Sequence, residues 1–183
     1  MKIKTIIDEN GGFAAHQIIW AYDYGSKSRS KYSAKHDNIL WYAKNKDSYV
    51  FDYKNIDRVP YMSNRCNSMM KQNRGKVITD VWWNTIVPTN GKEKTGYPTQ
   101  KPLAILERIV KMHSKTNDIC LGFFAGSGSF LEACFKHNRY SVGIDINPQA
   151  IKVMKKRLPT FLYSDLTGGI NPNKSFNDLC EEQ

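Results

Sequence analysis

The chain has 183 residues and a formal net charge of +10, and 40% of its residues are hydrophobic. This length and composition suit one domain with its own apolar core and exclude a wholly disordered or fibrous chain. The longest uncharged stretch in the C-terminal half, 119–131, is too short to cross a bilayer, and the N-terminus lacks the apolar run of a signal peptide. We therefore expect a soluble cytoplasmic protein with no membrane partner.

The cysteines and histidines give no sign of a metal site. Cysteines stand at 66, 120, 134 and 180 without C-x-x-C spacing, and the four histidines form no H-x-x-x-H pair. We expect buried or half-buried free thiols, and neither a metal nor a disulfide framework.

The positive charge is concentrated in two segments. Residues 24–46 hold six Lys and Arg against one Asp, and residues 58–76 hold five Lys and Arg with no acid. A concentrated basic surface suits a polyanion, most simply nucleic acid. A solvated basic face on an unrelated protein would give the same pattern, so the charge alone leaves both interpretations open.

The N-terminal half predicts few regular elements. Two aromatic and β-branched runs, 17–22 and 38–44, predict strands joined by a polar, basic loop. Residues 45–97 hold scattered aromatics without a sustained period. They form either an insert that contacts a ligand or ordinary loop and short strand with a small satellite core. Apolar residues at helical spacing after Pro102 then predict an amphipathic helix of about three turns.

The C-terminal part predicts alternating strands and helices. A buried strand over 118–124 leads through a glycine turn into a helix over 127–137. A second strand over 140–146, a helix capped by Asn147 and a third strand over 160–164 follow. This βαβαβ order predicts an α/β fold, the half of a doubly wound sheet that binds a nucleotide-like cofactor.

The turn after the first of these strands carries the first chemical signal. Gly126 and Gly128 let the backbone turn tightly and approach a ligand, and the N–H groups at the helix start favour a negative group. Asp145 can accept hydrogen bonds from both hydroxyls of a ribose. This combination fits NAD, FAD or S-adenosylmethionine, although the missing third glycine argues against a dinucleotide. A structural turn beside a solvated acid would look the same.

Three sequence blocks decide between these possibilities. They read PTQKP at 98–102, LGFFAGSGSF at 121–130 and GIDINP at 143–148. In order and spacing they resemble the β class of DNA amino-methyltransferases, in particular the type III-like modification subunits of restriction systems. The resemblance covers about residues 3–165. It implies a site-specific DNA methyltransferase that uses S-adenosylmethionine and acts on adenine N6 in preference to cytosine N4. A Rossmann oxidoreductase would leave PTQKP unexplained.

The resemblance also implies roles for individual residues. Lys101 and Pro102 would border the methionine part of the cofactor, Asp145 would hold its ribose, and Ile146 would lie against the adenine. Taken alone, Lys101 could equally be a surface lysine. The implied cofactor contacts are Lys101, Pro102, Phe124, Ala125, Gly126, Ser127, Gly128, Asp145, Ile146 and Asn147.

The basic loop 25–35 and the insert 45–95 would face double-stranded DNA, from which the target base is flipped out. The implied DNA contacts are Lys27, Arg29, Lys31, Lys35, Arg65, Lys71 and Arg74.

The catalytic block of the family is absent. That block is an Asp or Asn followed by Pro-Pro-aromatic, and the seven prolines here include no adjacent pair. We therefore assign no catalytic residue and expect a C-terminal fragment that is inactive alone. The family also has Asp where Gly122 stands, so we expect weak cofactor binding that Gly122→Asp would strengthen. The alternatives are a non-catalytic DNA-binding or regulatory remnant and one half of a split enzyme.

The family sheet order, 3-2-1-4-5-7-6, predicts that strands 4 and 5 are missing here. The expected fold is a partial Rossmann-like methyltransferase fold without its central strands, with a target-recognition insert. Strand 118–124 would then have a bare apolar edge, and the chain would be unstable or self-associating without a partner. That partner would be an upstream half-polypeptide or a restriction subunit.

The resemblance divides the chain into four parts. The expected parts are the strands and basic loop of the catalytic half over 1–46, the target-recognition insert over 47–95, the cofactor-binding half over 96–168, and a tail over 169–183.

Overall fold

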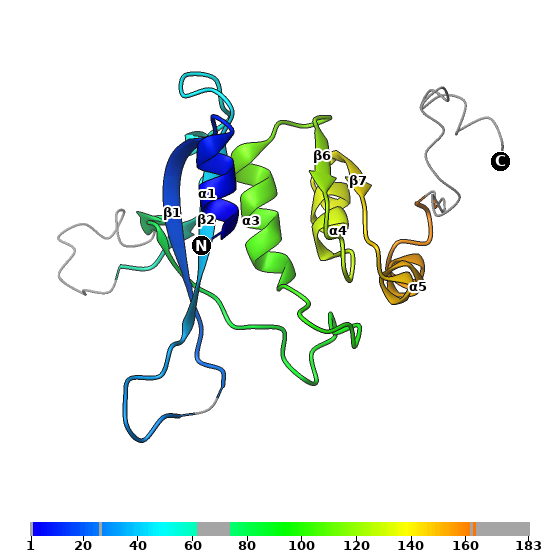
Figure 1. Ribbon diagram of the computed structural model, residues 1–183, viewed down its shortest axis with the longest axis horizontal. Coiled ribbons are helices and arrows are strands. Elements are labelled where there is room, and N and C mark those ends of the chain that lie inside the picture. Colours follow the sequence, from blue (N-terminus) through cyan, green and yellow to red (C-terminus); the bar gives the residue numbers. More distant parts are fainter. Residues whose placement is uncertain (1, 26, 62–73, 162, 164–183) are drawn as a thin grey trace.

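A computed structural model describes residues 2–25, 27–61, 74–161 and 163 (Figure 1). Its elements are α1 (Lys2–Glu9), β1 (Phe13–Ala21), β2 (His36–Ala43), the 3₁₀ helix η1 (Tyr53–Asn55), β3 (Arg58–Val59), β4 (Lys76–Val77), β5 (Val81–Trp83), α3 (Leu103–His113), β6 (Ile119–Gly122), α4 (Ser129–Lys136), β7 (Tyr140–Gly143) and α5 (Pro148–Arg157). The predicted DNA contacts Arg65 and Lys71 and the tail 169–183 lie outside the described residues.

The first sheet has the order β2-β1-β5. β1 and β2 are antiparallel and confirm the strands predicted near 17–22 and 38–44, and β5 adds to β1 in parallel. Strand β5 was not predicted, because three residues are too few to show a period of two. Trp82 of β5 is nevertheless buried with Ile18, Trp20 and Ile105. The range 47–95 thus contributes a strand to this sheet.

The second sheet that bears on the site consists, among the described strands, of β6 and β7, which are parallel and in register from Ile119–Tyr140 to Gly122–Gly143. Strands β3 and β4 form a separate short antiparallel sheet. Helix α4 packs on one face of the β6–β7 sheet: a Cβ placed on Gly122 would lie 3.1 Å from the Phe130 ring, and one on Gly143 would lie 2.6 Å from Leu131 Cδ1. The two β-α connections and the parallel pairing confirm the α/β class.

Helix α3 connects the two sheets. Its Ile105 packs with the first sheet, while Leu103 and Val110 pack with Ala133 and Cys134 of α4. In Figure 1, α3 stands between β2 on one side and β6 on the other. Within the described residues the two sheets share no hydrogen-bonded strand pair. The structure is therefore an α/β fold with a partial sheet, as predicted.

Two predicted elements differ in the structure. Strand 118–124 was predicted to be buried, but the side chains of Ile119, Leu121 and Phe123 are exposed. This prediction was wrong because no described element covers that face. The third strand, 160–164, is not formed where the chain is described: residues 159–161 turn back, and the Tyr163 hydroxyl donates to Leu158 O at 2.8 Å. Residues 162 and 164 lie outside the described part.

The aromatic residues of the irregular segment pack against the body of the protein. Tyr49 and Phe51 lie 5.3 and 5.4 Å, between ring centroids, from Trp41 of β2, and Trp41 lies 4.5 Å from His113 of α3. Burial lowers the pKa of His113. This cluster is the satellite core that the sequence offered as one of two interpretations.

No helix in the described part of the chain is long and apolar enough to span a membrane. The described residues also contain no cluster of three His, Cys, Asp or Glu side chains that could hold a metal ion. Cys120 and Cys134 are free thiols, and burial, with Cys120 close by, raises the pKa of Cys134 to about 12.

Candidate functional site

The glycine turn between β6 and α4 has the backbone that the sequence predicted. Gly126 and Gly128 have φ values of 53° and 74°, in the left-handed region that favours glycine. A Cβ on Gly128 would lie 2.8 Å from Met154 Cγ, and one on Gly126 would lie 3.3 Å from the Tyr97 ring. Close packing on both sides therefore leaves little room for a side chain. The helix begins at Ser129, later than the predicted residue 127, because Gly128 is its N-cap.

Asp145 fixes this turn from the end of the neighbouring strand. Its Oδ2 accepts a hydrogen bond from Gly126 N at 2.7 Å, and its Oδ1 accepts one from Asn147 N at 2.8 Å. Each carboxylate oxygen retains a further lone pair for a ligand hydroxyl. The sequence predicted that Asp145 binds a ligand. The structure shows that its carboxylate also holds the glycine turn in place.

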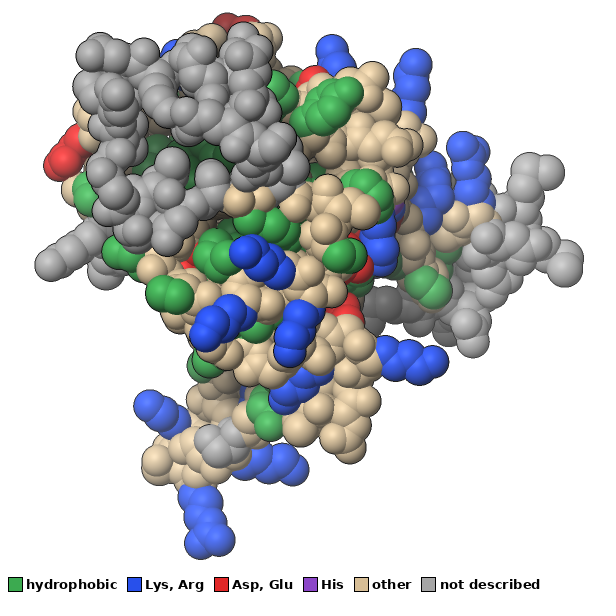
Figure 2. Space-filling view, turned by 90° about the vertical axis from the view of Figure 1, so that its right-hand side faces the viewer, with side chains coloured by type: hydrophobic (Ala, Val, Ile, Leu, Met, Phe, Trp, Pro, Cys, Tyr) green, Lys and Arg blue, Asp and Glu red, His purple; other side chains and the backbone are tan. Residues whose placement is uncertain are grey.

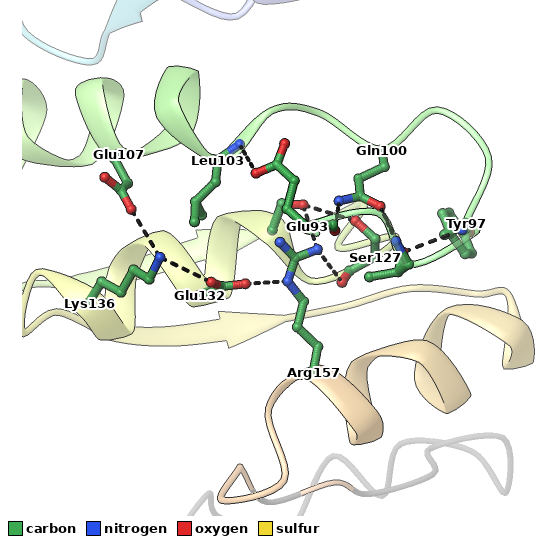
Figure 3. A network of polar contacts seen from close by, with 11 residues as sticks. Glu93, Tyr97, Gln100, Leu103, Glu107, Ser127, Glu132, Lys136 and Arg157 are labelled. Carbon is green, nitrogen blue, oxygen red and sulfur yellow. Dashed lines mark hydrogen bonds and ion pairs between the residues drawn. The ribbon is translucent and has the colours of Figure 1, made fainter. Parts of the chain in front are cut away.

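The proline block reaches the same turn. Its Gln100 side chain accepts hydrogen bonds from Thr95 N and Oγ1 at 2.9 and 2.8 Å and donates to Glu93 O at 2.7 Å (Figure 3). The loop thus held presents Tyr97, whose hydroxyl accepts from Asn147 Nδ2 at 3.3 Å and whose ring borders Gly126. The three sequence blocks therefore meet at one place.

Arg157, at the end of α5, stabilises the glycine turn through hydrogen bonds, as Figure 3 shows. It donates to a carboxylate oxygen of Glu132, to Ser129 Oγ at 2.9 Å and to Ser127 O at 3.4 Å. Its side chain is only 8% exposed. Lys136 pairs with the same Glu132 at 3.2 Å. Burial raises the pKa of Glu132, but the hydrogen bonds and charges of Arg157 and Lys136 outweigh it and leave that pKa below its usual value.

Sequence reasoning did not find this bracing role. Arg157 and Glu132 lie 25 residues apart on different helices, and no local spacing connects them.

Lys101 faces the first sheet and is not a freely solvated lysine. Its Nζ lies 3.4 Å from Asp37 Oδ2 of β2 and 5.2 Å from the centre of the Trp20 ring of β1. These residues line an open cavity of about 640 Å³ together with Tyr22 and Tyr97. The cavity joins the proline block to the base of the strand hairpin.

The remaining predicted cofactor contacts divide into exposed and buried residues. Phe124 and Ile146, the latter directly after Asp145 in the sequence, are almost fully exposed, and Asn147 is exposed as well. Ala125, Ser127 and Pro102 are buried, so they shape the turn and the start of α3. Exposed apolar side chains and a carboxylate with free lone pairs are the groups that suit a nucleoside, which has an apolar ring and ribose hydroxyls that donate hydrogen bonds.

A family model described as DNA methylase matches residues 1–156 of this chain. The chain belongs to the N6/N4 DNA methylase family. Among the curated members it resembles the type II methyltransferase M.HpaI of Haemophilus parainfluenzae, with 35% identity over 155 residues, which is 85% of this chain and 48% of the relative. The DNA adenine methyltransferase YhdJ of Escherichia coli strain K12 is 31% identical over 150 residues, 78% of this chain and 51% of that protein.

The fold is shared with a protein of known structure. The complex of M1.HpyAVI with SAM superposes with a TM-score of 0.64 at 28% identity, over 86% of this chain and 68% of that one. This DNA methylase chain spans about half the length of the curated relatives that it matches.

The basic loop between β1 and β2 of this DNA methylase family member is closed by one of its own cations. Lys35 Nζ donates to Tyr24 O at 2.8 Å and to Gly25 O at 2.7 Å. Lys27, Arg29 and Lys31 are exposed on this loop, which protrudes at the bottom of Figure 1. Figure 2 shows Lys and Arg side chains on the part of the molecule that protrudes at the bottom of that view. Lys35 was expected among the DNA contacts, and its contacts here hold the loop closed. Arg74 is also exposed.

Proposed function

We propose that this chain is part of a DNA amino-methyltransferase of restriction–modification type and includes its cofactor-binding half. The meeting of the three blocks at the glycine turn, through the contacts of Asp145 and Tyr97, is the observation that carries the proposal. The cofactor is S-adenosylmethionine, in keeping with the SAM complex of M1.HpyAVI. Adenine N6 is favoured as the methylated atom, because the relative YhdJ is named an adenine methyltransferase.

Bound S-adenosylmethionine supplies an electrophilic methyl group. Asp145 accepts hydrogen bonds from the ribose hydroxyls with the lone pairs that Gly126 N and Asn147 N leave free. Phe124 and Ile146 cover the adenine ring, which removes their exposed apolar surface from water. Lys101 borders the methionine part in the orientation set by Asp37 and Trp20.

The DNA duplex lies across the basic loop. Lys27, Arg29 and Lys31 contact phosphates, because these exposed cations belong to one protruding loop. Lys35 acts indirectly by keeping the loop closed. The segment 47–95 includes the target-recognition insert, 1–46 belongs to the catalytic half, and 96–168 forms the cofactor-binding half.

The group that activates the base amine lies outside these 183 residues. An exocyclic amine is a poor nucleophile because its lone pair is delocalised into the ring, so it needs a hydrogen-bond acceptor beside it. The family tetrapeptide that does this has two adjacent prolines, and these 183 residues contain no such pair. An upstream half-polypeptide that carries this tetrapeptide is the partner we propose.

Calorimetry with S-adenosylmethionine tests the cofactor assignment. We expect weak binding that Asp145→Ala abolishes and Gly122→Asp strengthens, with Gly122→Asn as the uncharged control. Both Gly122 variants must displace Phe130 by a few tenths of an ångström, since a Cβ there lies 3.1 Å from its ring. Binding of NAD in place of S-adenosylmethionine would overturn the assignment. Methyl transfer to DNA by the chain alone would instead overturn the proposal that the activating group lies outside these residues.

A second candidate function is a non-catalytic DNA-binding or regulatory module. The absence of the tetrapeptide together with the basic loop favours it. Salt-dependent binding to duplex DNA, with no methyl transfer even after the upstream half is added, would select this alternative.

A further inference from the structure

Tyr32 carries a fully exposed aromatic ring on the basic loop between β1 and β2. Its exposed fraction is 102%, so nothing in the described part of the chain packs on its side chain. The neighbouring Tyr22 is used differently: its ring lies 5.3 Å from that of Trp20, between centroids, and its hydroxyl donates to Asp37 Oδ1 at 3.3 Å. A single exposed apolar side chain is ordinary on a protein surface, so the surroundings of Tyr32 must decide what the ring does.

Those surroundings are cationic. Residues 24–35 contain four Lys and Arg and no Asp or Glu, and Lys31 directly precedes Tyr32. The loop protrudes from the body of the protein at the bottom of Figure 1. A polyanion that these cations attract is therefore brought against the tyrosine ring. Nucleic acid fits both features, because it offers phosphates to the cations and, on every base, a flat face on which an aromatic ring can stack.

Hydrogen bonds fold the backbone on both sides of Tyr32. Ser28 Oγ accepts from Ser30 N and from Lys31 N, each at 3.3 Å. Ser28 N donates to Ser33 Oγ at 2.8 Å, which connects the two sides of the turn. The loop around the ring is thus folded before a ligand binds, so less conformational entropy is lost on binding.

The base of the same loop borders the open cavity beside the proline block. Lys35 lines this cavity of about 640 Å³ together with Tyr97 and Lys101. Tyr32 lies three positions before Lys35, so their Cα atoms are at most about 11 Å apart. The ring can therefore reach the part of a bound duplex that lies next to the cavity.

We propose that Tyr32 is a positioning residue that inserts its ring into the DNA base stack and occupies the gap left when a base turns out of the helix. This rests on the proposed function, which places duplex DNA across the loop. Unstacking a base costs free energy, and an aromatic ring that stacks in the gap offsets part of that cost. Tyr32 increases the population of the extrahelical base and does not touch the reacting atoms.

A duplex with one abasic site tests this role, because an abasic site is a gap in the base stack at any sequence. The probe carries a fluorescent purine analogue beside the gap, and the same duplex without the gap is the reference. With the full chain of 183 residues we expect tighter binding to the gapped duplex. We also expect the fluorescence of the analogue to be quenched as the tyrosine ring stacks on it.

Three variants identify the ring as the cause. Tyr32→Ala should weaken binding to the gapped duplex about tenfold, within the range for stacking of one base on an aromatic side chain, and should hardly affect the intact duplex. Tyr32→Phe keeps the ring and should bind as the unaltered chain does. Tyr140→Ala is the control, because Tyr140 is also exposed but stands at the end of β7 away from Asp145.

Equal affinity for the gapped and intact duplexes would overturn the role of Tyr32, as would a preference for the gap that persists in Tyr32→Ala. Loss of that preference in Tyr32→Phe would assign the effect to the hydroxyl group and would overturn it as well. A chain that prefers the gap but binds no S-adenosylmethionine would refute the proposed function and leave the role of Tyr32 intact. Binding of cofactor and DNA without the preference would do the reverse, and no binding to either duplex would overturn both.

Discussion

Arg157 shows how one side chain can hold a functional turn that it does not line. It connects α5 to Glu132, Ser129 and the Ser127 carbonyl, and its side chain is nearly buried. Arg157→Ala would leave Glu132 half-buried with only Lys136 as its ionic partner. We expect a loss of about 3 kcal/mol in unfolding free energy, measured by urea denaturation. Lys156→Ala removes an exposed cation from the same turn of α5 and is the control. Equal stability of the two variants would contradict this bracing role.

Alanine substitutions at Gly128 and Gly96 distinguish the effect of backbone strain on stability from the effect of steric overlap. Both have positive φ, 74° and 81°, but a Cβ on Gly128 would meet Met154 Cγ at 2.8 Å, whereas one on Gly96 meets nothing within 4 Å. Alanine at either position should lower the unfolding free energy by about 1 kcal/mol, because its side chain disfavours the left-handed backbone. Gly128→Ala should lose about 1–3 kcal/mol more because the core is overpacked. Thermal melting of both variants measures the difference, and similar melting temperatures would contradict the packing argument.

At the scale of elements, α4 is held to its neighbours by carboxylates that must stay ionised. Burial raises the pKa of Glu132, but Arg157 and Lys136 lower it below the usual 4.5. The same balance holds at Asp57, where Arg108 and Lys111 of α3 donate at 2.7 and 2.8 Å. For a carboxyl with a depressed folded-state pKa, the stabilisation is present above the unfolded pKa and is lost as pH falls through the folded one.

We therefore expect the melting temperature to fall steeply between about pH 5 and about pH 3, in the window below the usual carboxyl pKa values. Glu132→Gln should flatten that part of the profile while lowering stability at neutral pH. Glu9→Gln, at an exposed carboxyl of α1, serves as the control. A profile of Glu132→Gln parallel to that of the unaltered chain would show that the ion pair contributes nothing.

Elements with strong local signals could be predicted from the sequence. Helix α3 begins directly after Pro102 as predicted, and Asn147 caps α5 by accepting from Gln149 N at 2.9 Å. These features depend on neighbouring residues alone. Strand β5 could not be predicted, because its three residues are stabilised by pairing with β1, some 60 positions earlier.

Some features of the candidate site could likewise be predicted from the sequence, and others could not. The glycine turn and Asp145 follow from a motif, so their meeting was predictable. The bonds of Lys35 to Tyr24 O and Gly25 O depend on how one loop closes, and a count of charges cannot tell such a lysine from Lys31.

At the scale of the whole molecule, the charge distribution predicts how the affinity for DNA depends on salt concentration. A cation that contacts a phosphate releases a counterion, so its removal lowers the slope of log K against log salt by about 0.9. Lys31→Ala, on the protruding loop between β1 and β2, should show this change and weaken binding to all duplex sequences alike. Lys152→Ala, an exposed cation on α5, should leave the slope unchanged, although both variants lower the net charge equally.

Lys35→Ala separates local contact from loop closure in the same assay. Because Lys35 Nζ is engaged with two carbonyls of the loop base, its loss should loosen the loop and reduce affinity while changing the salt slope less than Lys31→Ala does. Fluorescence anisotropy of a labelled duplex across a salt series measures both quantities. If Lys31→Ala and Lys152→Ala gave the same slope, binding would depend on the net charge of +10, and the loop would have no special part in it.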